Sequence, residues 1–74
     1  MPGFRWTPDR MEQLESAIRR GRRVAFTRRG TEYVVVARRL TSVARRDALV
    51  GFLPMTGEEL TFVLEELEGF QVIE

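Results

Sequence analysis

Residues 22–40, RRVAFTRRGTEYVVVARRL, carry the strongest strand signal in the chain. Val24 and Phe26 alternate with Ala25 and Thr27 before Gly30, and an aromatic and β-branched run follows it at 33–37. Glycine takes the positive φ that a tight hairpin turn needs. We therefore predict two strands, at about 22–28 and 32–40, that fold back on each other as a hairpin.

The second of these strands is apolar on both of its faces. Val34 and Val36 face one side, while Tyr33, Val35 and Ala37 face the other. This pattern predicts either burial on both faces or a sharply bent strand inside a small barrel. The segment that follows, TSVARRD, has no apolar periodicity, so it is either a loop or a continuation of the strand that ends in a turn.

A helix is predicted before the hairpin, over about residues 8–20. Thr7 is placed as its N-cap, Pro8 occupies the first helical position, and Gly21 follows the last turn as a C-terminal glycine. The residues at helical spacing that form its narrow apolar stripe are Met11, Leu14, Ala17 and Ile18. Because the stripe is short, we expect the helix to cap an open end or face of the sheet.

Two further strands are predicted after the hairpin, at about 48–53 and 70–73, and Gly51 in the first of them suggests a bulge or tight bend. The acidic segment between them is ambiguous from local pattern. It fits a helix with Thr56 and Glu59 as a capping box. It fits equally well a strand over about 59–64, with alternate residues facing inward.

Composition limits the chain to one domain, residues 1–74, with a small core and no disulfide or zinc to reinforce it, because it contains no Cys and no His. We therefore expect a homo-oligomer. The net charge of +1 hides a division: residues 1–46 hold twelve Arg and four acids, or +8, and residues 47–74 hold seven acids and no base, or −7. Such asymmetry suits either an anionic partner or complementary faces that pair within the fold or between protein chains.

The sequence argues against catalysis and against cofactors or metal sites. Without His and Cys, the commonest general base, nucleophile and metal ligands are missing. Adjacent residues on a strand point to opposite faces, so neither acidic doublet, Glu58-Glu59 or Glu65-Glu66, converges on a substrate by itself. Both doublets are expected to be solvated charges. The N-terminal residues lack the apolar core of a signal peptide, and no apolar run approaches the ~20 residues of a membrane span, so we expect a cytoplasmic protein.

The order of these segments resembles the WYL domain, an Sm-like, SH3-type barrel of bacterial transcription regulators. The likeness is carried by two stretches, LESAIRRGRRVAF at residues 14–26 and FVLEELEGFQV at residues 62–72. It implies a mainly β, α+β fold in which an N-terminal helix precedes a five-stranded, strongly bent antiparallel barrel, with 59–64 as a strand and 65–67 as a short turn. The Trp-Tyr-Leu triplet of the family is absent, since Ala48-Leu49-Val50 stands at that place.

Arginine doublets around the hairpin are the feature that points to function. We predict that they form one cationic rim for nucleic acid or another polyanion, with Tyr33 adding base stacking if it is exposed. The predicted site residues are Arg28, Arg29, Arg38, Arg39, Arg45, Arg46 and Tyr33. The expected role is that of a transcription- or RNA-associated accessory protein. The alternative is a protein-interaction or self-assembly module that uses the complementary basic and acidic faces.

Overall fold

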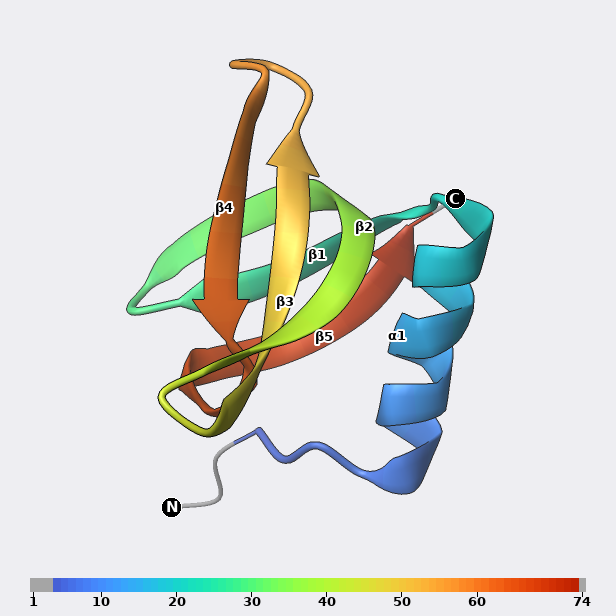
Figure 1. The fold of residues 1–74 in the computed structure, drawn as a ribbon, viewed down its shortest axis with the longest axis vertical. Coiled ribbons are helices and arrows are strands. Elements are labelled where there is room, and N and C mark those ends of the chain that lie inside the picture. The colour runs from blue at the N-terminus through green and yellow to red at the C-terminus, as the bar shows by residue number, and fades with distance from the viewer. Residues whose placement is uncertain (1–3, 74) are drawn as a thin grey trace.

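The computed structural model describes residues 4–73 as an N-terminal helix followed by a five-stranded antiparallel sheet (Figure 1). The elements in chain order are α1 (Pro8–Arg20), β1 (Arg23–Arg28), β2 (Thr31–Val43), β3 (Arg46–Leu53), β4 (Glu58–Val63), the 3₁₀ turn η1 (Leu64–Glu66) and β5 (Leu67–Ile73). The predicted mainly β architecture is confirmed, and the predicted helix has the same bounds.

The ambiguous acidic segment forms a strand, β4, and the alternative helix is wrong. Thr56 does not cap a helix, since its hydroxyl accepts a hydrogen bond from the Glu58 N–H at 3.3 Å within the β3–β4 turn. In β4, Phe62 points inward and is fully buried, whereas Thr61 is exposed. Pairing with β3 supplies hydrogen bonds along one edge of β4 and buries its apolar side, which outweighs the local helical spacing.

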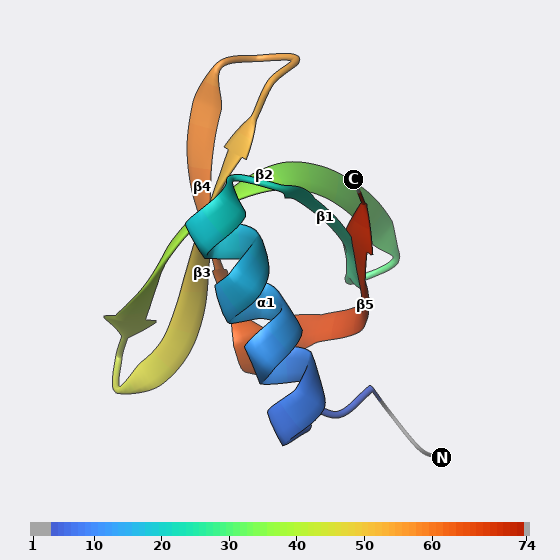
Figure 2. The same cartoon turned by 90° about the vertical axis from the view of Figure 1, so that its right-hand side faces the viewer.

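Helix α1 has the caps that the sequence predicts. The Thr7 hydroxyl accepts a hydrogen bond from the Arg10 N–H at 3.2 Å, and Gly21 ends the helix in the left-handed region at φ +65°. Leu14 and Ala17 are fully buried, because α1 packs against β1, β2 and β5 (Figure 2). The helical segments of residues 4–73 lack the length and apolar character needed to cross a membrane.

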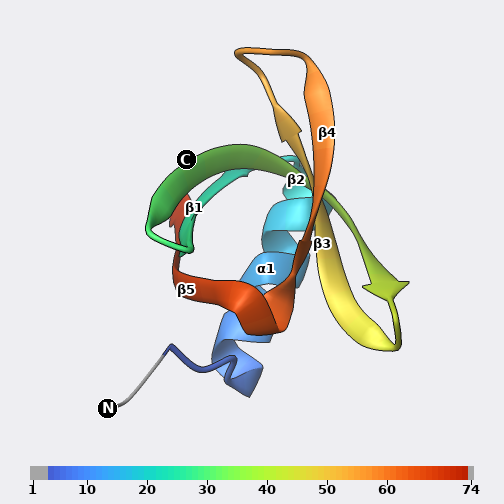
Figure 3. The same cartoon turned by 90° about the vertical axis from the view of Figure 1, so that its left-hand side faces the viewer.

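Strand β2 is the long, bent centre of a sheet ordered β4-β3-β2-β1-β5 (Figures 1 and 3). Its first half pairs with β1 and its second half with β3, and the register with β3 shifts between Ala37 and Arg39. A bulge of this kind bends a strand and increases its twist. The segment after Leu40 is therefore a continuation of the strand as far as Val43, and the turn is confined to Ala44 and Arg45.

The core lies on the inner face of the bent sheet and is closed by α1. Its buried members are Leu14, Ala17, Val24, Phe26, Val35, Ala37, Leu49, Phe62, Leu64 and Leu67. Gly51 does not mark a bulge in β3, as the sequence suggested, because the bulge lies in β2. Glycine is required there for space, since a Cβ at position 51 would stand 2.6 Å from Cγ2 of Val35.

Candidate functional site

The predicted arginines lie in three groups along β2 and do not form one rim. Arg28 and Arg29 lie at the β1–β2 turn, and Arg45 and Arg46 lie at the β2–β3 turn. These two turns are at opposite ends of the thirteen-residue strand β2, and Figures 2 and 3 show them on opposite sides of the molecule. The remaining doublet, Arg38 and Arg39, lies between them, within β2. Because β2 is long and bent, it keeps these two turns apart, whereas a short strand would have held them close together.

The first group is built around an aromatic cluster. Tyr33 is half-buried, and its ring centroid lies 5.8 Å from that of Phe26 and 5.1 Å from that of Phe62. The Arg28 guanidinium lies over both Tyr33 and Phe62, 5.6 and 5.2 Å from their centroids. Tyr33 therefore packs against the end of the core, and its half-buried ring meets the condition of exposure for base stacking only in part. In this group Arg29 is the exposed cation, held at φ +51° in the turn.

The bulge in β2 brings the second doublet, Arg38 and Arg39, to the same face of the sheet. Neighbouring residues on a regular strand point to opposite faces, but an inserted residue breaks this alternation. The Arg38 guanidinium lies 4.8 Å from the centroid of the Phe52 ring. Arg39 pairs with Val50, which shares a face of β3 with Phe52. Both arginines are exposed, and we call Arg38, Arg39 and Phe52 the bulge patch.

Phe52 is a site residue that sequence reasoning missed. It is half-buried on the outer face of the sheet, in one cross-strand row with Arg23 of β1 and Val36 of β2. The parity of Ala48, Val50 and Phe52 could have indicated that these three share a face, but not which face is the outer one. The Arg38 guanidinium lies over this ring, so this face combines positive charge with planar groups on which a base can stack.

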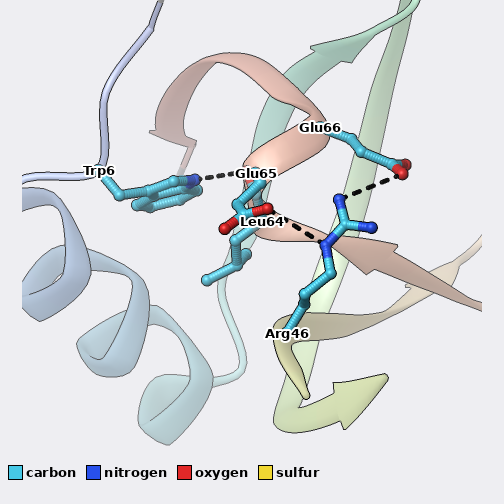
Figure 4. A network of polar contacts seen from close by, with 5 residues as sticks. All are labelled: Trp6, Arg46, Leu64, Glu65 and Glu66. Carbon is cyan, nitrogen blue, oxygen red and sulfur yellow. Dashed lines mark hydrogen bonds and ion pairs between the residues drawn. The ribbon is translucent and has the colours of Figure 1, made fainter. Parts of the chain in front are cut away.

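The third group is partly neutralised by acids of the same chain. The Arg46 Nε lies 3.2 Å from Oε1 of Glu65, and an Arg46 terminal nitrogen lies 3.7 Å from Oε2 of Glu66 (Figure 4). This pairing joins the β2–β3 turn to η1. Arg45 is exposed in the turn itself, at φ +67°. Arg46 therefore has a role within the fold, and Arg45 is the accessible cation of this doublet.

Trp6 joins the N-terminal segment to the same corner of the molecule. Its indole Nε1–H donates a 2.8 Å hydrogen bond to the Leu64 carbonyl, as Figure 4 shows. The centroid of its ring lies 5.0 Å from that of the Phe70 ring. We expect Trp6→Phe to lower the free energy of unfolding by about 1 kcal/mol, because it leaves that carbonyl without this donor. Urea unfolding followed by circular dichroism measures the loss. The exposed Arg46→Gln change is the control and should cost less, under about 1 kcal/mol.

Most of the candidate arginines are not neutralised within the chain. Of the six, Arg46 alone is within 4.0 Å of an acidic side chain in the part of the chain that the structure describes. Arg28 and Arg38 lie over aromatic rings. Within residues 4–73, neither an acidic side chain nor an aromatic ring contacts the guanidinium of the exposed Arg29, Arg39 or Arg45. The described acids of the C-terminal third thus pair with one candidate arginine, Arg46, and leave the others available to an external anion.

A scan against protein-family models finds no match, and searches of curated proteins and of solved structures find none either. The likeness to WYL and Sm-like domains therefore rests on the sequence segments that suggested it. β4 and η1 each lie one residue before the strand at 59–64 and the turn at 65–67 that were expected, which concerns the fold and not the family.

Proposed function

We propose that this protein binds single-stranded nucleic acid along β2, without catalysis, with the bulge patch as the central contact. The observation that carries the proposal is that Arg38 and Arg39 share one exposed face with an aromatic ring, and that no acid of residues 4–73 lies within 4.0 Å of either guanidinium. Guanidinium groups bind phosphates, and an aromatic side chain accepts an unstacked base. A role as an accessory protein in transcription or RNA metabolism would suit such binding.

The spacing of the three groups favours a flexible, extended ligand. Arg29 and Arg45 are each several residues of strand away from the bulge patch, at about 3.3 Å per residue along β2. A short oligonucleotide would reach the bulge patch alone, whereas a longer one could bend around the sheet and contact an end group as well. We therefore expect affinity to rise with oligonucleotide length.

Fluorescence anisotropy with labelled oligouridylates of about three and about twenty nucleotides tests the proposal. The wild-type protein should bind the longer one more tightly, with affinity that falls steeply as salt is added. Arg38→Glu with Arg39→Glu should weaken binding about tenfold or more. It should also reduce the slope of log K against log salt by about 1.4, at about 0.7 per phosphate contact.

A matched control is Arg19→Glu with Arg20→Glu, which changes the net charge equally at exposed positions of α1. This variant should keep most of the affinity. Equal losses in the two variants would show that binding follows net charge and not the bulge patch. Equally tight binding of heparin, which has no bases to stack, would contradict the nucleic-acid assignment and leave a general polyanion binder.

The competing hypothesis is self-association through the basic and acidic faces. Its support is the charge division of the chain together with the exposed acids Glu58 and Glu59 on β4, an edge strand of the sheet. Glu65 and Glu66, however, already contact Arg46 of their own chain. A salt-sensitive oligomer in sedimentation velocity, combined with no oligonucleotide binding at low salt, would favour this hypothesis over ours.

A further inference from the structure

A groove of about 710 Å³ lies between α1 and β5, which are different elements from those that carry the bulge patch. Figures 1 and 2 show the two elements side by side. Ala17 of α1 and the half-buried Phe70 and Val72 of β5 give the groove an apolar component. The polar residues that line it include Arg19 and Arg20 in the last turn of α1.

One wall of this groove is formed by an edge strand of the sheet. β5 is the last strand in the order β4-β3-β2-β1-β5, and within residues 4–73 it pairs with β1 alone. Residues 70–72 of this strand line the groove. An edge strand presents unpaired backbone N–H and C=O groups on its free side, which can form a ladder with another extended chain.

The charge of the groove specifies what kind of chain would fit. Arg19, Arg20 and Arg22 line it. Among the lining residues that the structure describes, Glu12 is the one acid, and the exposed guanidinium groups of Arg19 and Arg20 favour acidic side chains on a segment that pairs with β5. The apolar surface from Phe70 and Val72 suits the alternate side chains of such a segment, since successive residues on a strand point to opposite sides.

We infer that the groove between α1 and β5 binds an extended acidic segment of a partner protein, which adds to the sheet as a strand beside β5. Backbone pairing with residues 70–72 supplies affinity, and Arg19 and Arg20 select for acidic side chains. Nucleic acid lacks the peptide groups that such a ladder needs. The groove is therefore a second site, independent of the proposed nucleic-acid contact.

The test uses a blocked, labelled peptide of about eight residues in which glutamate alternates with valine, a length typical of a strand. It should bind saturably, and amide hydrogen exchange at residues 70–72 should slow when it is present. Arg19→Glu with Arg20→Glu should weaken this binding about tenfold while leaving oligonucleotide binding intact. Arg38→Glu with Arg39→Glu should have the opposite pattern.

The control peptide has the same sequence with alternate backbone nitrogens methylated, which removes the donors that a ladder requires. Equal binding of both peptides would overturn the inference, because attraction between charges alone would then explain it. Unchanged binding in the Arg19→Glu, Arg20→Glu variant would overturn it as well. Protection of residues 70–72 that rises with protein concentration in the absence of peptide would assign the groove to a second copy of this chain, and would also contradict the inference.

Discussion

Phe62→Ala is expected to lower the free energy of unfolding by about 3–5 kcal/mol, the cost of removing a large buried aromatic side chain. Phe62 is fully buried, and its ring centroid lies 4.8 Å from that of Phe26 and 5.1 Å from that of Tyr33. A chain of 74 residues has a total stability of about 4–11 kcal/mol, at about 0.05–0.15 kcal/mol per residue. This single change should therefore remove about a quarter or more of the stability, and in the lower part of that range it should unfold the protein.

Urea unfolding followed by circular dichroism measures the effect, with Phe52→Ala as the matched control. Phe52 is the same residue type, but it is half-buried on the outer face of the sheet. Its loss should cost clearly less, because less apolar surface returns to water. If Phe52→Ala were the more damaging change, the inner face of the sheet would not hold the main core.

Gly51→Ala is expected to destabilise the protein by about 1–3 kcal/mol through overpacking. The new Cβ would lie 2.6 Å from Cγ2 and 2.9 Å from Cβ of Val35, and Val35 is fully buried. Where space allows, the same substitution usually stabilises a protein by about 0.4–1 kcal/mol, because alanine has less freedom in the unfolded chain. The sign of the measured change therefore reports directly on the contact between β2 and β3.

A double-mutant cycle with Val35→Ala isolates that contact. Removing the two γ-carbons of Val35 takes away the closest neighbour of the new Cβ but leaves the Val35 Cβ at 2.9 Å, so the double variant should be somewhat more stable than the sum of the two single losses predicts. Additive losses would show that the γ-carbons are not what the new methyl group meets. A Gly51→Ala variant as stable as the wild type would show that the two strands can separate enough to admit it.

The candidate site could be predicted from sequence as a set of residues but not as an arrangement. The doublets are visible in the sequence, and so is the preference of Gly30 for a turn, where it adopts φ +80°. A regular strand would point Arg38 and Arg39 to opposite faces, and only the register shift beside Ala37 places both on the outer face. Such a shift depends on how β2 and β3 pair, and nothing in the local pattern of β2 reports it.

The amino-acid sequence by itself determined α1, the hairpin of β1 and β2, and the absence of histidine and cysteine chemistry. Caps, turn residues and periodicity are local properties, so Thr7, Gly21 and Gly30 could be interpreted without their neighbours in space. Tertiary structure alone decided that residues 58–63 form a strand, that Tyr33 packs against the core and that the arginines separate into three groups. Each of these depends on contacts between residues distant in the chain, which outweigh local preferences because burial and strand pairing contribute more free energy than propensity does.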